Sequence, residues 1–292
     1  MTSVIFRNER SRQTMEQAYQ RLLAEAPQAR SHQVKTRFGE THMLVAGPEQ
    51  APPLVAVHGA MGNSALALWD GHPLVERFRV YALDVLGHSV KGADVRLRMD
   101  SADYGEWLVD VLDALGLPRA HLYGASLGGY ILRKLAEVAP DRIDRLALLV
   151  PAGIIVGPLV QGITRNGIPL ALYRTTGSKA ALNRFLDSLF TVPDAIFGEY
   201  MGKALKHYRL DLALPPLGTP EPLAAFRRPT LIMAASDDIT APGRALLARA
   251  AQLFPHATLE LHENHKHIPP TDEASRARLC ARVTRFLLEE VA

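Results

Sequence analysis

Cysteine is almost absent from the 292-residue sequence, which contains only Cys280. A single thiol cannot form an internal disulfide, so a small secreted scaffold held by disulfides is excluded. Long apolar runs are also lacking. The longest, residues 146–160, is interrupted by Pro151 and Gly153 and is too short to span a bilayer. Because the first residues also contain no apolar core of a secretory signal, we expect a cytoplasmic protein with no membrane span.

The sequence also has no large excess of positive over negative residues, or the reverse. Lysine and arginine number 33 and aspartate and glutamate 30, so the net charge is only +3, and no block of five like charges occurs. We therefore expect no nucleic-acid partner. The remaining composition, 48% hydrophobic and 22% charged, is that of an ordinary globular protein. A chain of this length buries about three-quarters of its unfolded surface, which is enough for one large core.

Apolar runs that are rich in β-branched residues recur along the chain and indicate buried strands. They cover residues 41–47, 53–59, 79–84, 121–125, 145–153 and 229–236, with a more polar run at 258–262. Runs that are apolar throughout are typical of strands covered on both faces. Helical patterns lie between and beside them, at residues 10–26, 101–117, 126–139, 242–254 and 272–291. The alternation predicts an α/β fold with a mostly parallel sheet and helices on both faces.

One segment departs from this alternation. Residues 154–227 contain helical patches separated by proline and glycine but no buried strand. An insertion of this length between two core strands is too long for a loop. We expect a helical cap, or lid, at residues 154–227 over the carboxyl ends of the strands, and a core made of residues 1–153 and 228–292.

A serine stands where a short strand meets a helix. Residues 124–129 read Gly-Ala-Ser-Leu-Gly-Gly, with Ser126 at the turn. A sharp turn exposes the serine oxygen, small flanking residues let backbones approach closely, and the N–H of the next residue, Leu127, points toward a developing oxyanion. The pattern indicates a nucleophilic serine. The alternative is a glycine-rich turn with an ordinary surface serine.

With these motifs the chain resembles the α/β-hydrolase superfamily over nearly its whole length. The resemblance rests on the elbow at Ser126, the cap insertion, and two motifs that follow successive core strands, His58-Gly59 and Asp84-x-x-Gly87-His88. Residues 36–60 look most like bacterial carboxylesterases that cleave arylpropionate esters. The resemblance implies the α/β-hydrolase fold and a triad in the chain order serine, acid, histidine.

The acid of this triad is expected after the strand at 229–236, where two candidates stand, Asp237 and Asp238. Family members often read G-x-x-D-x-x-x-P in this loop. Asp238 stands four residues before Pro242 and matches the acid, although Ala235 replaces the glycine. The resemblance therefore implies Asp238, with Asp237 as the alternative.

The base is expected after the strand at 258–262. This loop contains His262, His265 and His267, and the related pattern N-x-G-H-x-P aligns His267 with the histidine. Lys266 stands where glycine is usual, so His265 stays open as the alternative base. The spacing of the three histidines matches no standard zinc signature, and we expect no metal.

The resemblance also implies an oxyanion hole formed by the N–H groups of Ala60 and Leu127, with Met61 as the alternative donor to Ala60. It places three polar residues near this site, and we interpret them as structural: His58 packs under the turn, and Asp84 and His88 organise a loop.

These residues together predict acyl transfer by a serine hydrolase, most simply a carboxylesterase acting on a small-molecule ester without a cofactor. A lactonase, thioesterase or C–C bond hydrolase would use the same triad, and a slow-turnover sensor of small molecules is the alternative of another class. The apolar cap residues suggest an acyl pocket, with Leu170, Phe190, Phe197 and Tyr200 as candidate substrate contacts. A homo-oligomer is compatible with the sequence.

Overall fold

An eight-stranded sheet forms the centre of the computed structural model, which describes residues 3–211 and 213–289. The strand order is β1-β2-β4-β3-β5-β6-β7-β8. In this sheet β2 runs in the direction opposite to the other strands. The strands are β1 (Arg30–Thr36), β2 (Gly39–Ala46), β3 (Pro53–Val57), β4 (Arg79–Leu83), β5 (Ala120–Ala125), β6 (Ile143–Leu149), β7 (Thr230–Ala235) and β8 (Thr258–His262). The predicted mostly parallel sheet is confirmed.

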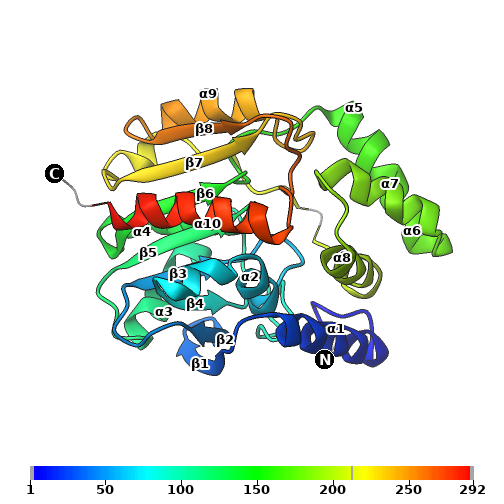
Figure 1. The fold of residues 1–292 in the computed structure, drawn as a ribbon, viewed down its shortest axis with the longest axis horizontal. Helices are drawn as coiled ribbons and strands as arrows, with labels where there is room; N and C mark the ends of the chain where they lie inside the picture. Colours follow the sequence, from blue (N-terminus) through cyan, green and yellow to red (C-terminus); the bar gives the residue numbers. More distant parts are fainter. Residues whose placement is uncertain (1–2, 212, 290–292) are drawn as a thin grey trace.

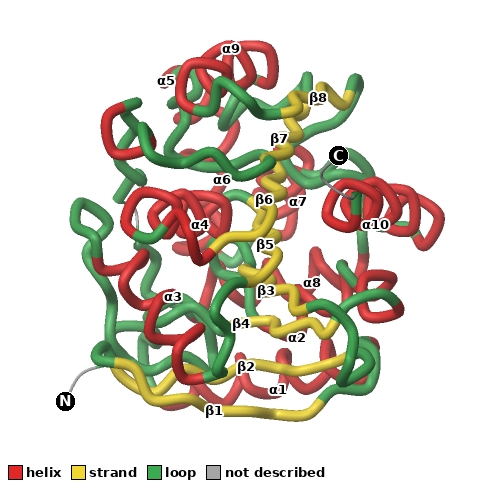
Figure 2. The backbone as a smooth tube through the Cα atoms, turned by 90° about the vertical axis from the view of Figure 1, so that its left-hand side faces the viewer, coloured by secondary structure: helices red, strands yellow, loops and turns green. Residues whose placement is uncertain are grey.

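Helices cover both faces of this sheet (Figure 2). One face packs against α3 (Asp103–Ala114), α4 (Leu127–Val138) and α9 (Gly243–Leu253). The other packs against α2 (Ser64–Asp70) and α10 (Glu273–Leu288), and α1 (Glu9–Glu25) extends that layer. Short 3₁₀ turns are η1 (His72–Glu76), η2 (Pro140–Arg142) and η4 (Glu221–Leu223). Every residue of β7, the strand next to the edge strand β8, is buried, because apolar layers meet it on both sides.

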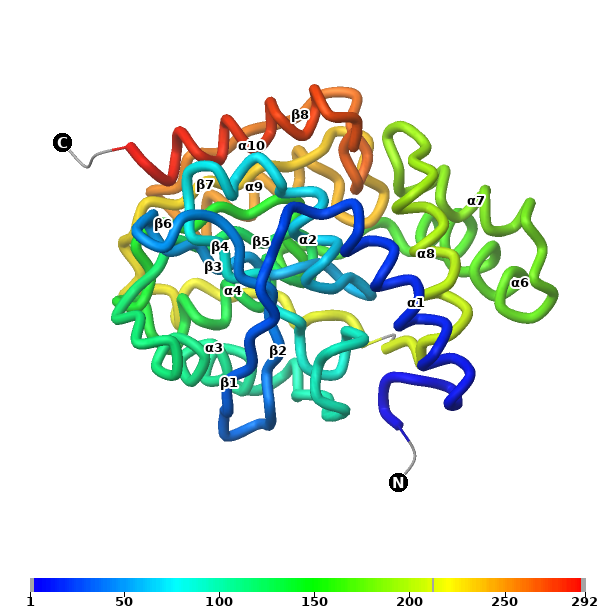
Figure 3. Tube along the Cα trace, turned by 60° about the horizontal axis from the view of Figure 1, so that its bottom comes forward, coloured from blue at the N-terminus to red at the C-terminus, as the bar shows by residue number. Residues whose placement is uncertain are grey.

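Between β6 and β7 the chain forms a run of helices. They are α5 (Leu159–Gln161), the π-helical turn η3 (Gly162–Gly167), α6 (Ile168–Thr176), α7 (Lys179–Leu189) and α8 (Ala195–His207). These helices gather at one end of the sheet, and α1 lies beside α8 (Figures 1 and 3). Tyr173, Phe185 and Leu205 belong to a small apolar core of their own. The limits of a separate cap at 154–227 stay a prediction.

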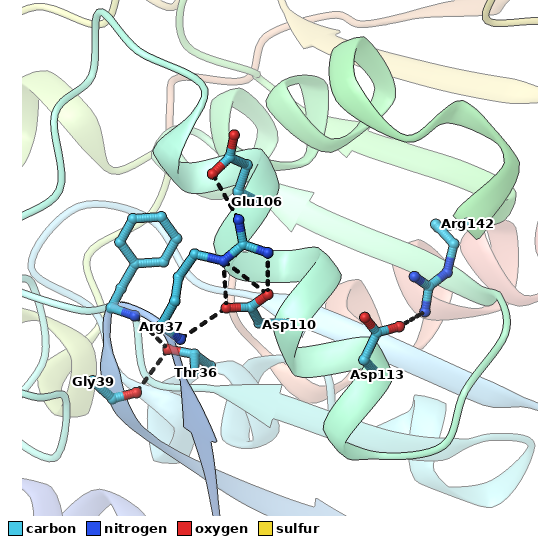
Figure 4. A network of polar contacts seen from close by, with 8 residues as sticks. Thr36, Arg37, Gly39, Glu106, Asp110, Asp113 and Arg142 are labelled. Atoms are coloured by element: carbon cyan, nitrogen blue, oxygen red, sulfur yellow. Dashed lines mark hydrogen bonds and ion pairs between the residues drawn. The ribbon is translucent and has the colours of Figure 1, made fainter.

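The sheet begins with a strand that the sequence analysis missed. Only Val34 of β1 is buried, so the strand lacks the apolar signal used to find the others. The β1–β2 turn is instead fixed by polar contacts. The Arg37 guanidinium binds both carboxylate oxygens of Asp110 on α3, with Nη2 2.8 Å from Oδ1, and also contacts Glu106 (Figure 4). This bidentate contact holds the edge of the sheet on the helix layer.

Within residues 3–211 and 213–289, none of the helices combines the length and the apolar character that crossing a membrane requires.

Candidate active site

Ser126 lies at the turn between β5 and α4. Its φ of 51° is in the left-handed region, which is unusual for a residue with a side chain. Two glycines make this turn possible. A Cβ on Gly128 would lie 2.1 Å from the carbonyl oxygen of Val57, and one on Gly124 would lie 2.8 Å from the backbone of Gly128. The close approach of β3, β5 and α4 therefore requires glycine at both positions, and it lifts Ser126 to the carboxyl end of the sheet.

A chain of hydrogen bonds joins Ser126 to the loops that follow β7 and β8. Nε2 of His267 is 2.9 Å from Oγ of Ser126, and Nδ1 of His267 is 2.7 Å from Oδ2 of Asp238. With a proton on Nδ1, the histidine donates to the carboxylate and its Nε2 accepts from the serine hydroxyl. This is the arrangement that activates a serine as a nucleophile.

The second oxygen of Asp238 is also saturated with hydrogen bonds. The hydroxyl and the amide of Thr240 both donate to Oδ1 at 2.7 Å, and the amide of Ala241 donates at 3.1 Å. Burial, which leaves Asp238 only 2% exposed, would raise the pKa of its carboxyl. The charge of His267 and the bonds from His267 and Thr240 outweigh burial and hold that pKa below its usual range. Asp238 is therefore an ionised acceptor that orients the imidazole.

The two alternative residues lie in the same loops but make other contacts. Asp237 is exposed, and its carboxylate accepts from the hydroxyl of Ser236 at 2.8 Å. His265 directs Nδ1 to the carbonyl oxygen of Glu263, and its own carbonyl accepts from the amide of Asp237 at 2.8 Å. The backbone bond connects one loop to the other, and no hydrogen bond of the described residues joins either side chain to Ser126. The structure thus brings Asp238 and His267 to the serine, and not Asp237 or His265.

The loop that contains His267 is hydrogen-bonded, on both sides of His267, to residues between β6 and β7. The amide of Lys266 donates to Oγ1 of Thr191 at 2.9 Å, and the Lys266 ammonium reaches the carbonyl of Asp187 at 2.6 Å. Ile268 exchanges backbone bonds with Leu189 and Thr191, at 2.8 and 2.9 Å. Lys266, which stands where related proteins have glycine, therefore attaches the loop of His267 to Asp187 and Thr191. No sequence signal pointed to Thr191 or Thr240, because both act through contacts distant in the chain or within a loop.

The expected oxyanion donors lie beside Ser126. Leu127 is the first residue of α4, so its N–H has no partner within the helix. Ala60 and Met61 belong to the loop after β3, and both line a cavity that Ser126 and Leu127 also line. Met61 has a φ of 61°, and its carbonyl oxygen accepts a 2.8 Å hydrogen bond from the hydroxyl of Tyr200 on α8. The Tyr200 contact thereby holds the loop after β3, which contains the expected second donor.

Buried hydrogen bonds hold both ends of the loop after β3, at His58 and at Ser64. His58 accepts from the amide of Val85 at Nε2 and donates from Nδ1 to the carbonyl of Gly59, so it is neutral, and burial lowers its pKa. The Asp84 carboxylate accepts from the amide and the hydroxyl of Ser64, at 3.0 and 2.6 Å. These are contacts of loop-organising residues and not of catalysts.

His88, like His58, is buried and hydrogen-bonded within the protein. Its Nε2 lies 3.0 Å from the hydroxyl of Tyr104, and burial together with Arg96 lowers the pKa of His88 to about 4. A neutral, buried imidazole bonded to a tyrosine supports the loop after β4 and has no hydrogen bond to Ser126.

Two cavities open at Ser126. The main cavity, about 400 Å³, contains His267 and is lined on the cap side by Phe185, Leu189, Phe197 and Met201. The side cavity, about 230 Å³, contains Leu127 and is lined by residues that include Leu170, Leu205 and Tyr208.

The candidate substrate contacts divide between these cavities and the cap interior. Phe197 lines the main cavity and Leu170 the side cavity. Phe190 is buried and packs edge-on against Phe197, with ring centroids 5.1 Å apart. Tyr200 is buried and contacts the Met61 loop instead of either cavity.

The known proteins to which this chain is similar include bacterial carboxylesterases. The Bacillus subtilis (strain 168) protein named Uncharacterized carboxylesterase nap is 27% identical over 268 residues, which cover 89% of this chain and 87% of that protein. Carboxylesterase YbfK from the same strain is 38% identical over 142 residues, which cover 47% of this chain and 46% of that protein. The crystal structure of naproxen esterase (carboxylesterase NP) from Bacillus subtilis has a TM-score of 0.78 and 27% identity, covering 93% of this chain and 96% of that structure.

The predicted likeness to bacterial carboxylesterases is confirmed by these relatives. A family model described as alpha/beta hydrolase fold also matches residues 52–200, which include β3 to β6, the elbow and most of the helices before β7. The sheet order, the elbow and the sequence relatives lead to the same assignment. The chain belongs to the alpha/beta hydrolase fold family.

Proposed function

We propose that this chain is a serine carboxylesterase that cleaves small to medium apolar or aryl carboxylic esters through an acyl-enzyme. The observation that carries the proposal is the hydrogen-bonded chain from Ser126 through His267 to Asp238, at 2.9 and 2.7 Å. The carboxylesterases among the relatives support the same chemistry.

The steps follow from the geometry. His267 takes the proton of Ser126 as Oγ attacks the ester carbonyl, and Asp238 stabilises the imidazolium that forms. The carbonyl oxygen becomes an oxyanion between the N–H groups of Leu127 and Ala60, where each donor is worth roughly 10²–10³ in turnover. His267 then gives its proton to the leaving alkoxide. Water repeats the sequence on the acyl-enzyme, and no cofactor takes part.

The two cavities support an ester with two apolar halves. Since both meet at Ser126, the acyl group and the alcohol group occupy different cavities on either side of the scissile bond. Walls made of leucine, phenylalanine and methionine favour alkyl and aryl groups over charged ones. The helices over these cavities act as the cap in this proposal, with residues 154–227 as its extent. The cytoplasm is the compartment we propose, because the chain has a single cysteine.

The test is a panel of p-nitrophenyl esters, from acetate to octanoate with an arylacetate, given to wild type and single alanine variants. Ser126→Ala and His267→Ala are expected to lose roughly 10⁴-fold or more in kcat, and Asp238→Ala only slightly less. Asp237→Ala and His265→Ala are the matched controls and should retain activity within a few-fold. A wild type that cleaves none of these esters, or an Asp237→Ala variant as inactive as Ser126→Ala, would contradict the proposal.

A further inference from the structure

The main cavity extends from Ser126 into the layer between the sheet and α2. Its walls there are Ala56 of β3, Ala67 of α2, Leu74 of η1, Val80 of β4 and Leu149 of β6. These side chains face the same layer as α2 and α10. The alanines leave open a space that larger apolar residues would fill. The cavity is therefore an apolar channel through the protein interior on one side of the nucleophile.

Two polar side chains stand in this apolar channel, Asp70 and Tyr123. Tyr123 is three residues before Ser126 on β5, which corresponds to about 10 Å along the strand. Asp70, the last residue of α2, lines the same channel, and its charge helps to raise the pKa of Tyr123.

Neither of these side chains makes a hydrogen bond or an ion pair with another of the described residues. Buried polar groups are nearly always hydrogen-bonded, so a carboxylate and a phenol in an apolar channel require an explanation. Asp70 is accessible only in part, and it faces the channel.

The surroundings of Asp70 leave its carboxylate available as an acceptor. Burial raises the pKa of Asp70 to about 6, Arg276 of α10 opposes this change, and Asp194 at the start of α8 adds to it. Arg276 forms no ion pair with Asp70. Its Nη1 instead donates to the carbonyl of Trp69 at 2.6 Å, and its guanidinium stacks on the indole ring of Trp69. Cys280 is the other titratable group near Tyr123.

We propose that Asp70 and Tyr123 form a subsite for a hydroxyl group at the far end of an elongated ester substrate. The hydroxyl would donate to the Asp70 carboxylate and accept from the Tyr123 phenol, so both unpaired groups are satisfied at once. A neutral hydroxyl fits better than an ammonium group, because Arg276 already places a positive charge near this carboxylate. The inference rests on the proposed esterase activity and names the substrate class that the site selects: esters with an apolar chain that ends in a hydroxyl.

The experiment compares kcat/KM for matched pairs of esters. One pair varies the acyl half, p-nitrophenyl octanoate against p-nitrophenyl 8-hydroxyoctanoate, and a second varies the alcohol half, octyl acetate against 8-hydroxyoctyl acetate. Wild type is expected to prefer the hydroxylated member of one pair by at least about tenfold, and that pair identifies the half that enters the channel. p-Nitrophenyl butanoate is too short to span the distance of about 10 Å to Tyr123 and serves as the reference substrate.

The variants separate this subsite from a structural role. Asp70→Leu and Tyr123→Phe should abolish the preference for the hydroxyl, while kcat/KM for the butanoate ester stays within about twofold. Asp70→Asn keeps an acceptor and should keep part of the preference. Equal rates for both members of both pairs in wild type would overturn the inference, and so would equal losses on the butanoate and hydroxylated esters in Asp70→Leu. If the butanoate ester is cleaved and Ser126→Ala abolishes that cleavage, the proposed function stands in either case.

Discussion

Loss of the Tyr200 hydroxyl should slow catalysis, although Tyr200 lines neither cavity. Tyr200 on α8 donates a 2.8 Å hydrogen bond to the carbonyl oxygen of Met61, whose φ is 61°. Tyr200→Phe would leave that partly buried carbonyl unpaired, which costs up to about 1–3 kcal/mol. A residue with a side chain held at such a φ stores on the order of 1 kcal/mol, so the loop would gain by relaxing away from this conformation.

The relaxation would move the N–H groups of Ala60 and Met61, one of which faces the oxyanion in the proposed mechanism. Complete loss of one donor lowers kcat roughly 10²–10³-fold, and this is the upper limit for the variant. If about half of the free energy is lost, kcat should fall about tenfold. KM for a short p-nitrophenyl ester should change little, because the contact acts on the transition state more than on the bound ester.

Steady-state kinetics with p-nitrophenyl butanoate would measure this effect, and Tyr173→Phe is the matched control. The Tyr173 hydroxyl donates a 3.0 Å hydrogen bond to the carbonyl oxygen of Gly202 on α8, has no hydrogen bond to the Met61 loop, and lines neither cavity. The control should therefore keep kcat within about twofold. Equal kcat values in wild type and Tyr200→Phe, or equal losses in both variants, would refute the view that α8 positions the oxyanion loop.

Three further changes have definite expected outcomes. Thr191→Val removes the hydroxyl that accepts from the amide of Lys266; kcat for short esters should fall several-fold with an unchanged thermal midpoint, and unchanged kinetics would count against the loop's anchoring role. Gly128→Ala places a Cβ 2.1 Å from a backbone oxygen, so calorimetry should show a loss of roughly 3 kcal/mol or more, or no folded protein. Burial alone raises the pKa of Asp84, but bonds from His42 and Ser64 hold it below its usual range. The carboxylate therefore adds stability above the unfolded pKa of about 3.9 that is lost as pH falls through the folded pKa. In urea unfolding, the difference in free energy of unfolding between wild type and Asp84→Asn should become smaller below about pH 4. A difference that stays constant with pH would contradict this prediction.

The core strands could be predicted from the sequence because burial on both faces leaves a continuous apolar run, as in β7. The edge strand β1 could not, since a strand with one buried residue has the composition of a loop. The helix α2 was missed for a related reason: at seven residues it is too short for a helical period to be recognised.

The site shows the same division. Ser126 follows from local spacing, because the strained turn needs glycines at fixed positions. The choice between Asp237 and Asp238 follows only from the resemblance, and the geometry that separates them is a hydrogen bond across 29 residues. The contacts of Tyr200 and Thr191 join the cap to loops far away in the chain, so no local pattern contains them. The channel toward Asp70 is likewise a property of packing between the sheet and a helix layer.

In the proposed mechanism His267 and Asp238 make Ser126 nucleophilic, and covalent labelling of the serine would test this role. Wild type would be treated with a fluorophosphonate and the modified peptide identified by mass spectrometry, beside His267→Gln, His265→Gln and Asp237→Asn. We expect a single label on Ser126 in wild type, His265→Gln and Asp237→Asn, and a rate of labelling reduced by several orders of magnitude in His267→Gln. Rapid labelling of His267→Gln, or a label on another serine, would contradict it.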